Sequence, residues 1–585
     1  MIQLFSLKRI LQAGAILLAL ISVYLYKKTK PASSDKIKGL FFAVPFAIMQ
    51  YISMDLDSDN LINEFVPSAF LFARALLVIA VSFVISFCLS SICFGLVEKG
   101  RKKITASVSE KQQPSDSGKY LKKYFSSWAK VFACWLPYFI LFFPGTSNHG
   151  DTEKQLRMFF HREVGFPLTM SPVQGPDIFI SDHHPYFTTW LYGTFTKLGL
   201  DLTGHAFIGV AIFSFLQLLL FAGVLVYFWV RFLSLGISDK IVKRGLLFTA
   251  LFPFFPIFSV CMVKDMTFAF FCLTTMMLLF EILITNSNIL NKWYFYPLLS
   301  LSTLLMMMSK GQGKYFAYIL LVVLILSFRE KWLQLLPTFI IPILFYQLIW
   351  QGMLLPSWNI APAGKQETLG ILFQQTARYV SEYENEMTPE EIAAIDRVLP
   401  YETIVSSYDP LKSDKLKWTF RQNCTSEDIL TYTKYWFSML LKHPGVYFAA
   451  TLNTSYKFFD ITWQTTPFFT KFNSRIDKSD EIYIYSFFTD GWLGDKIKGL
   501  FGLLQKIPVL GLLFSVSFYT WLAYFAFLAA IGKNKDRRTV MTILPFLSVL
   551  VYFACPVSLS RYAQPLIMMT IPMMIGVMLP DKANK

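Results

Sequence analysis

Long runs of apolar residues alternate with short polar stretches along almost the whole chain. A transmembrane helix needs about 20 mostly apolar residues to cross the hydrocarbon core of a bilayer. We therefore predict an all-α polytopic membrane protein with about 13 transmembrane helices. The predicted spans lie at roughly 10–26, 39–54, 65–97, 128–143, 206–230, 245–262, 266–284, 293–308, 314–328, 332–350, 509–531, 540–557 and 562–579.

Basic residues gather in some of the loops between these spans, and this distribution predicts the orientation of the chain. The basic loops lie at 27–38, 98–124, 231–244, 328–331 and 532–538, and a count of spans places all five on one side. Loops rich in Lys and Arg usually stay in the cytoplasm. The sequence thus predicts a multi-pass protein of the plasma (cytoplasmic) membrane, with its other polar segments on the extracytoplasmic face.

The polar segments divide the chain into three parts. Residues 1–350 form an N-terminal transmembrane module that includes a polar external loop at 144–205, and residues 509–585 form C-terminal transmembrane helices. Residues 351–508 have the composition of a small, mainly helical extracytoplasmic region. Within it we expect a helix that starts near Pro389 and a helical segment broken at His443–Pro444.

The composition agrees with this class and excludes others. Apolar residues make up 54% of the chain and charged residues only 16%, less than in a typical soluble domain. The net charge of +16 comes largely from the basic loops, and no basic domain with interleaved aromatic residues accompanies it, so we predict no nucleic-acid partner. The chain lacks the GxSxG and HExxH motifs, and the absence of a Walker A motif disfavours an ATP-driven pump.

The external loop at 144–205 holds most of the residues that could carry chemistry. Five of the six histidines lie in it or at its end, and titratable groups where a helix leaves the bilayer usually have a function. Asp151 follows a span end and Gly150, and a partly desolvated carboxylate there should have a raised pKa suited to general-base catalysis. The alternatives are an exposed loop acid or an N-cap for the sequence DTEKQL.

The sequence Asp182-His183-His184 is the second candidate. With His149 and Asp151 it could bind a metal, or it could orient substrate, or it could simply cap the helix that follows. Adjacent histidines do not share a helix face, so we assign no metal ligands. Gln155 is a further candidate for orienting substrate.

Basic residues at four other external span ends form the third candidate group. Lys264, Lys310, Lys314 and Arg561 could hold a phosphate through charge-assisted hydrogen bonds, and Asp265 lies beside Lys264. Each lysine or arginine taken alone is also consistent with a side chain that extends to the membrane interface. Their occurrence on one predicted face favours a phosphate site.

The order of a span, an external loop with a conspicuous aspartate, further external helices, many spans and a soluble external region resembles a known superfamily of membrane enzymes. PGTSNHGDTEKQL, DHHPYFTTWLYG, VKDMTFAF and SRYAQPL look like a family of uncharacterised bacterial membrane proteins placed near the GT-C superfamily of integral membrane glycosyltransferases. This resemblance implies a polyprenyl-phosphate-linked sugar donor and a cell-envelope glycan, lipid or protein as acceptor. Asp151 matches the acidic residue of the first external loop, the usual catalytic base. The lone aspartate departs from the acidic pair of many relatives and leaves open a requirement for Mg²⁺ or Mn²⁺.

The resulting hypothesis is an inverting single displacement. Asp151 would deprotonate the acceptor, while Gln155, Asp182, His183, His184, Lys264, Asp265, Lys310, Lys314 and Arg561 would bind the substrates. A polysaccharide polymerase or ligase is an alternative, because it also uses lipid-linked sugars and a large external loop. A transporter or lipid flippase is another, although such a protein would place polar residues at the bilayer midplane, where these spans have few.

Overall fold

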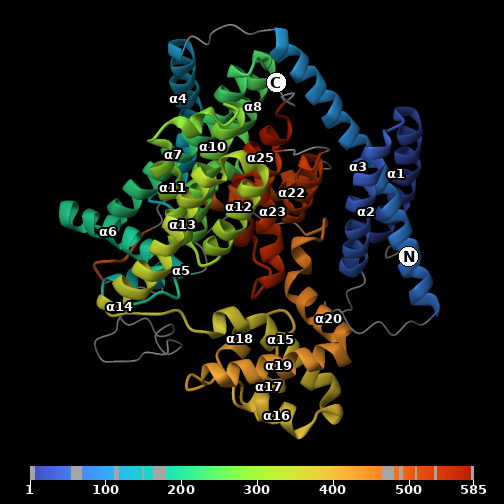
Figure 1. Cartoon of the computed structure of the whole chain (residues 1–585), viewed down its shortest axis with the longest axis vertical. Coiled ribbons are helices and arrows are strands. Elements are labelled where there is room, and N and C mark those ends of the chain that lie inside the picture. Colours follow the sequence, from blue (N-terminus) through green and yellow to red (C-terminus); the bar gives the residue numbers. More distant parts are fainter. Residues whose placement is uncertain are drawn as a thin grey trace.

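The computed structural model describes residues 7–54, 69–110, 117–147, 150–162, 180–463, 480–485, 492–507, 510–532 and 537–580. Its regular structure is almost entirely helical, so the all-α prediction is confirmed (Figure 1). Helices α1 to α3 form a group at one side of the molecule, and most of the remaining long helices form a second, larger bundle. The group consists of α1 (Leu7–Thr29), α2 (Ser33–Met54) and α3 (Ala69–Glu110).

The larger bundle is built around α7 and α10, which are apolar along most of their length and bury much of their surface. The C-terminal helices pack against α10 and α12, so segments far apart in the sequence form one core. The members of the bundle are α4 (Ser117–Leu141), α7 (Ala206–Ser234), α8 (Asp239–Leu251), α9 (Phe254–Ser259), α10 (Lys264–Ile284), α11 (Phe295–Ser309), α12 (Gly313–Ser327), α13 (Trp332–Leu344), a π-helix (Phe345–Leu354), α14 (Leu355–Ser357), α22 (Val516–Ala530), α23 (Thr539–Val551), α24 (Gln564–Met568) and α25 (Thr570–Val577).

Four helices in the described part of the chain are long and apolar enough to cross a membrane: Ala75–Ala106, Ala206–Ser234, Lys264–Ile284 and Arg329–Ser357. Four shorter apolar helices accompany them. The predicted number of about 13 spans is not confirmed. Two predicted spans are broken, since 245–262 divides at Phe252–Pro253 into α8 and α9, and 562–579 divides at Met569 into α24 and α25. At about 1.5 Å per residue, neither half of the second broken run is long enough to span a bilayer.

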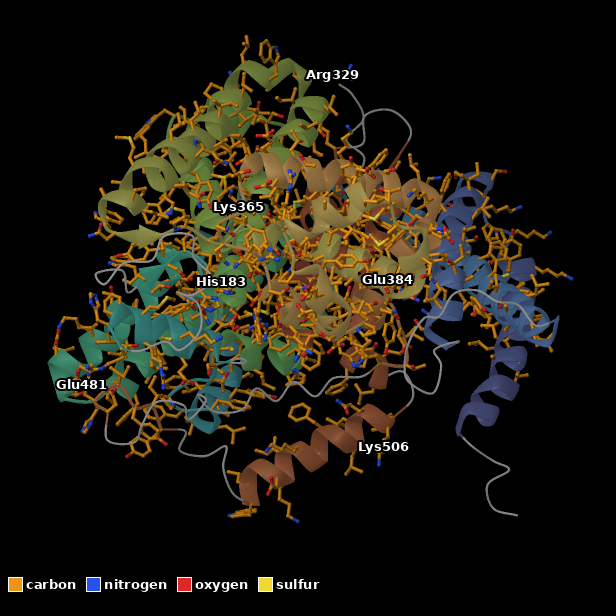
Figure 2. The ribbon with its side chains drawn as sticks, turned by 90° about the horizontal axis from the view of Figure 1, so that it is seen from below. His183, Arg329, Lys365, Glu384, Glu481 and Lys506 are labelled. Carbon is orange, nitrogen blue, oxygen red and sulfur yellow. The ribbon has the colours of Figure 1, made fainter. Side chains whose placement is uncertain are left out.

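A separate helical domain lies at one end of the larger bundle (Figures 1 and 2). Its own apolar core extends from Phe373 to Tyr447, a narrower range than the predicted region 351–508. Thr388 caps the helix that starts at Pro389, and His443 separates the last two helices, as the sequence predicts. The helices are α15 (Gln366–Tyr383), α16 (Pro389–Asp396), α17 (Tyr401–Ser407), α18 (Asp414–Lys417), α19 (Ser426–Lys442) and α20 (Pro444–Ser455).

Short backbone contacts fix this domain to the bundle. Strand β1 (Ile180–Ser181) pairs in parallel with β2 (Ile360–Ala361), which leads into α15. On another side, the Ser413 N–H donates to the carbonyl of Pro556 at 2.9 Å, and Lys412 forms an antiparallel bridge with Val557. The domain is therefore tied both to the loop before α6 (Tyr186–Thr203) and to the loop after α23.

The opposite end of the bundle has ion pairs and exposed tryptophan side chains. Near the C-terminal ends of α7 and α10, the guanidinium of Arg231 donates from Nε and Nη2 to the two carboxylate oxygens of Glu281, both at 2.7 Å. Arg537 pairs with Glu330 in the loops of the same end. Trp293 and Trp332 are exposed there, and exposed tryptophans of this kind are typical of a membrane interface.

Candidate active site

A backbone contact places the first residue of α5 (Asp151–Phe159) beside the first residue of α10. The Thr146 N–H donates to the carbonyl of Val260 at 3.1 Å, and the Met262 N–H donates to the carbonyl of Thr146 at 2.8 Å. The side chain of Thr152 also donates to the Met262 carbonyl. Gly150 has a φ of 78°, a left-handed conformation that glycine adopts without strain, and this turn directs the chain into α5.

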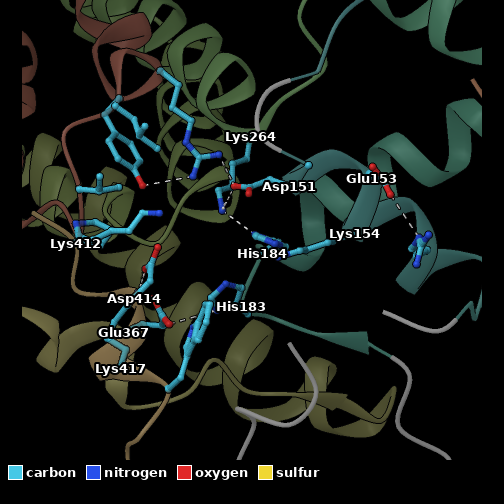
Figure 3. Close-up of a pocket in the computed structure, with 18 residues that line it drawn as sticks. Asp151, Glu153, Lys154, His183, His184, Lys264, Glu367, Lys412, Asp414 and Lys417 are labelled. Carbon is cyan, nitrogen blue, oxygen red and sulfur yellow. Dashed lines mark hydrogen bonds and ion pairs between the residues drawn. The ribbon is translucent and has the colours of Figure 1, made fainter. Parts of the chain in front are cut away.

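Three charged side chains from distant parts of the sequence meet at this point. Oδ2 of Asp151 lies 2.7 Å from Nη1 of Arg561 and 3.2 Å from Nζ of Lys264. The other carboxylate oxygen, Oδ1, accepts no hydrogen bond from any residue that the structure describes. Figure 3 shows Asp151 and Lys264 pointing toward each other, with His184 on the far side of the Lys264 ammonium.

The two cations set the charge state of the carboxyl group. Burial alone would raise the pKa of Asp151, but Lys264 and Arg561 outweigh this effect and hold the pKa well below its ordinary value. In return, although burial disfavours its charge, Arg561 has a raised pKa because Asp151 lies against it. The expectation of a raised pKa at Asp151 is therefore wrong for this state of the site, since the sequence did not reveal how closely the cations approach.

Both histidines of the predicted motif are neutral. Burial, and then the neighbouring Lys264, lower the pKa of His184 well below its ordinary value, and burial lowers the pKa of His183 to about 4. The ammonium of Lys264 can only donate, so Nδ1 of His184, 2.7 Å away, accepts and Nε2 carries the hydrogen. That Nε2–H is buried and has no acceptor among the described residues.

The helical domain supplies the other wall. Oε1 of Glu367, in α15, lies 3.7 Å from Nδ1 of His183, and Oε2 accepts from Lys417 at 3.0 Å. Lys417 also lies 3.1 Å from Asp414. Burial would raise the pKa of Glu367, but Lys417 and then His183 keep it below its ordinary value. The domain thus contacts the site through a set of mutually paired acidic and basic side chains.

Together these residues enclose a cavity of about 890 Å³ (Figure 3). Six basic and four acidic side chains line it, so with neutral histidines the wall has an excess of two positive charges. Apolar residues of the loop after α23, together with Trp418 and Tyr562, complete the lining. The charged residues are Lys154, Arg157, Lys264, Lys412, Lys417 and Arg561, against Asp151, Glu153, Glu367 and Asp414.

Two of the predicted residues lie behind this wall. Lys310 donates to Oδ1 of the fully buried Asp265, and neither residue lines the cavity. Both the Lys310 ammonium and the Arg561 guanidinium lie near the ring of Tyr562, with Nζ of Lys310 5.3 Å and Cζ of Arg561 5.1 Å from its centroid. Direct contact of Lys310 or Asp265 with a ligand in the cavity, expected from the sequence, is not available in this arrangement.

Three more predicted residues point elsewhere. Oδ1 of Asp182 accepts the Tyr186 N–H at 2.7 Å, the capping role that the sequence offered as an alternative, and burial raises the pKa of this carboxyl to about 7. Lys314 lies near Asp182, with its ammonium 5.2 Å from the centroid of the Tyr315 ring. Gln155 is fully buried and donates to the hydroxyl of Thr188 at 2.7 Å, so it joins α5 to α6 and does not face a substrate.

The arrangement does not fit a metal shared by Asp151 and His184. The ammonium of Lys264 lies within hydrogen-bonding distance of both side chains, where such an ion would have to sit. His149, the other histidine considered with them, lies outside the described residues. Within the described ranges, no three His, Cys, Asp or Glu side chains are grouped as metal ligands.

No sequence pattern predicts the wall of the cavity that the helical domain supplies. Glu367, Lys412, Asp414 and Lys417 belong to an ordinary polar region with no motif, and no spacing in it points to the residues near 151. Only the contacts between the domain and the loops at 180–184 and 556–557 bring them there. A sequence signal for these residues is therefore lacking.

Comparison with known proteins gives one family. None of the curated proteins matches the chain. A family described as of unknown function, DUF6020, matches residues 170–584. The match includes His183, His184, Lys264, Arg561 and the helical domain, and it begins after Asp151. Because it covers more than half of the sequence, the chain belongs to the DUF6020 family.

Proposed function

We propose that this protein transfers a sugar from a polyprenyl-phosphate-linked donor to a hydroxyl group of a cell-envelope acceptor on the extracytoplasmic side of the membrane. The observation that carries the proposal is the meeting of Asp151, Lys264 and Arg561 in one cavity at the ends of apolar helices. A carboxylate for proton transfer and two cations for a phosphate are the groups that this reaction requires.

The cavity is suited to a lipid with an anionic head group. Its wall has an excess of positive charge, and its arginine and lysine side chains are good donors to phosphate oxygens. It lies at the N-terminal end of α10, a helix long and apolar enough to cross a membrane. A donor with its phosphate in the cavity could therefore keep its polyprenyl chain in the bilayer.

The low pKa of Asp151 requires an explanation, because a carboxylate paired with two cations is a weak base. In our proposal Arg561 and Lys264 form ion pairs with the donor phosphate in place of their ion pairs with Asp151. The carboxylate then loses its partners and gains a negatively charged neighbour, and both changes raise its pKa. Asp151 would thus become an effective base only when a donor is bound, which would limit wasteful hydrolysis.

The chemical step is a single displacement. Asp151 accepts the proton of the acceptor hydroxyl while the oxygen of that hydroxyl forms a bond to the anomeric carbon. The bond from that carbon to the phosphate oxygen breaks, and the electron pair leaves with the phosphate. Lys264 and Arg561 stabilise the departing charge, and the configuration at the anomeric carbon is inverted. The neutral His184 offers its Nε2–H as a donor for orienting a substrate oxygen.

The proposal can be tested with the purified full chain in lipid vesicles. Polyprenyl monophosphates and diphosphates carrying radiolabelled glucose, mannose or galactose would serve as donors, with cell-envelope material as acceptor. Replacing Asp151→Asn keeps the shape of the side chain but removes the base, so we expect transfer to fall at least about 100-fold. The matched control is Asp201→Asn, because Asp201 is an exposed acid of α6 that pairs with Lys197 and does not line the cavity. Near-normal transfer by the Asp151 variant would exclude the proposed role.

A further inference from the structure

Lys412 differs from the other basic residues of the cavity. Lys264 and Arg561 pair with Asp151, Lys417 pairs with Glu367, and Arg157 lies 3.6 Å from Glu153. Lys154 also interacts with another group. The ammonium of Lys412 makes no ion pair and no hydrogen bond with any residue that the structure describes, although its side chain lines a wall that is already positive.

The backbone holds Lys412 in this position. Its N–H donates to the carbonyl of Asp409 at 3.1 Å, and it is bridged to Val557 in the loop that leads directly to Arg561. The following residue, Ser413, donates to Pro556. In the view of Figure 3, Lys412 extends into the cavity from the domain side, toward Asp151 and Lys264. The backbone of Lys412 is thus held in place, and its exposed side chain, unpaired among the described residues, extends toward the two cations that contact Asp151.

The charge of the wall indicates what Lys412 could bind. A sugar lipid with one phosphodiester group has one negative charge, whereas the diphosphate-linked equivalent has two. The lining residues have an excess of two positive charges. A single phosphate at Arg561 and Lys264 would leave Lys412 without a counter-charge, while a second phosphate would supply one.

We propose that Lys412 binds the second phosphate of a diphosphate-linked lipid donor, whose first phosphate is held by Arg561 and Lys264. This inference rests on the proposed function and narrows its donor class to polyprenyl diphosphates. It also gives the helical domain a direct role, since the domain contributes one of the phosphate-binding side chains to the site.

The test measures binding of probes that need no sugar transfer. The full chain in nanodiscs is titrated with farnesyl monophosphate, farnesyl diphosphate and inorganic pyrophosphate. We expect farnesyl diphosphate to bind most tightly. Lys412→Gln should weaken its binding about tenfold, equivalent to about 1.4 kcal/mol, and change monophosphate binding less than about twofold. The control is Lys415→Gln, because Lys415 is exposed, donates to the Ser406 carbonyl and does not line the cavity.

Several results would overturn the inference. Equal losses for both farnesyl probes in the Lys412 variant, or no loss for either, would show that Lys412 does not distinguish the second phosphate. Inorganic pyrophosphate binding as tightly as farnesyl diphosphate would show a site for a free anion and not for a lipid. Because no transfer is measured, these results are independent of the Asp151→Asn experiment, and a monophosphate donor would leave the proposed sugar transfer intact.

Discussion

Asp151 forms both of its ion pairs through a single carboxylate oxygen. Oδ2 contacts Arg561 and Lys264, while Oδ1 has no hydrogen-bond partner among the described residues. Salt bridges between buried groups are costly to break unless another partner replaces the one removed. An incoming phosphate is such a partner. In our proposal it replaces the carboxylate of Asp151, so Arg561 and Lys264 each keep an anionic partner.

This exchange can be followed through the reactivity of the carboxyl group. Hydrophobic carbodiimides modify carboxyl groups in their protonated form. With its pKa well below the ordinary value, Asp151 should react very slowly near neutral pH in the absence of a ligand. Farnesyl diphosphate should accelerate the modification, because each unit by which the pKa rises increases the protonated fraction about tenfold. The modified peptide is measured by mass spectrometry.

Asp182 provides the control for this experiment. Burial raises its pKa to about 7, and it does not line the cavity. Its modification should be substantial without any ligand, should decrease as the pH rises through about 7, and should not respond to farnesyl diphosphate. Protection of Asp151 by the ligand, in place of acceleration, would contradict the exchange of partners.

For individual residues, the sequence predicts which side chains form the site better than it predicts their protonation states. Charged and titratable groups at the ends of apolar runs are costly, and this rule points to five residues that the structure brings to one cavity: Asp151, His183, His184, Lys264 and Arg561. The pKa values of Asp151 and Arg561 depend on a contact between side chains 410 residues apart, and no local pattern reports such a contact.

Two left-handed glycines allow a test at the level of single elements. Gly150 precedes α5 with a φ of 78°, and Gly204 ends α6 with a φ of 76°. Alanine at either position should cost about 1 kcal/mol or somewhat more, since a left-handed conformation is strained for residues with a Cβ atom. We expect Gly150→Ala and Gly204→Ala to lower the Tm by similar amounts.

Only one of the two substitutions should affect the site. Gly150 directs the chain into Asp151, so Gly150→Ala should weaken the binding of farnesyl diphosphate, whereas Gly204→Ala should not. Thermal unfolding and ligand titration of the same preparations would check this. Equal binding by both variants would show that the turn at Gly150 does not position Asp151.

Some of the elements have no signal in the sequence, for physical reasons that can be named. The pairing of β1 with β2 involves only two residues on each strand, too few to produce an alternating pattern, so it was not predicted. The break at Met569 falls inside a continuous apolar run, where hydropathy alone cannot distinguish one long helix from two short ones. The breaks at Phe252–Pro253 and His443–Pro444 both lie at a proline, which cannot continue a helix. The sequence predicts the second of these breaks, whereas the apolar run around Pro253 is read as one span.

For the whole molecule, the two ends of the larger bundle predict the orientation in the membrane. The cavity and the helical domain lie at one end, and Arg231, Glu281 and the basic loops near Arg537 lie at the other. Basic loops favour the cytoplasm. The cavity should therefore open to the outside of the cell.

Cysteine labelling would check this orientation. Lys415→Cys places a thiol on the helical domain, and Lys292→Cys places one in the exposed loop between α10 and α11. Both would be made with Cys93 and Cys134, which are exposed, replaced by serine. An impermeant maleimide should label the first variant in intact cells and the second only after permeabilisation. The reverse pattern would place the cavity in the cytoplasm and contradict an extracytoplasmic reaction.

The sequence predicts least well which residues of the helical domain line the cavity. The polar region after residue 351 was recognised as a separate helical unit, and its core in the structure is indeed distinct from that of the bundle. Nothing in its sequence indicates that Glu367 and Lys417 face His183. Such docking depends on surface complementarity between two folded units, which a single sequence does not display.

The long separation between Asp151 and Arg561 also bears on biogenesis. As the polypeptide emerges from the ribosome, Asp151 and Lys264 are made long before the guanidinium that completes their cluster, which follows 410 residues after the aspartate. A nascent or truncated chain would contain the acid without its full set of counter-ions. Competence to bind a lipid phosphate would therefore appear only after the segment around Arg561 has been made.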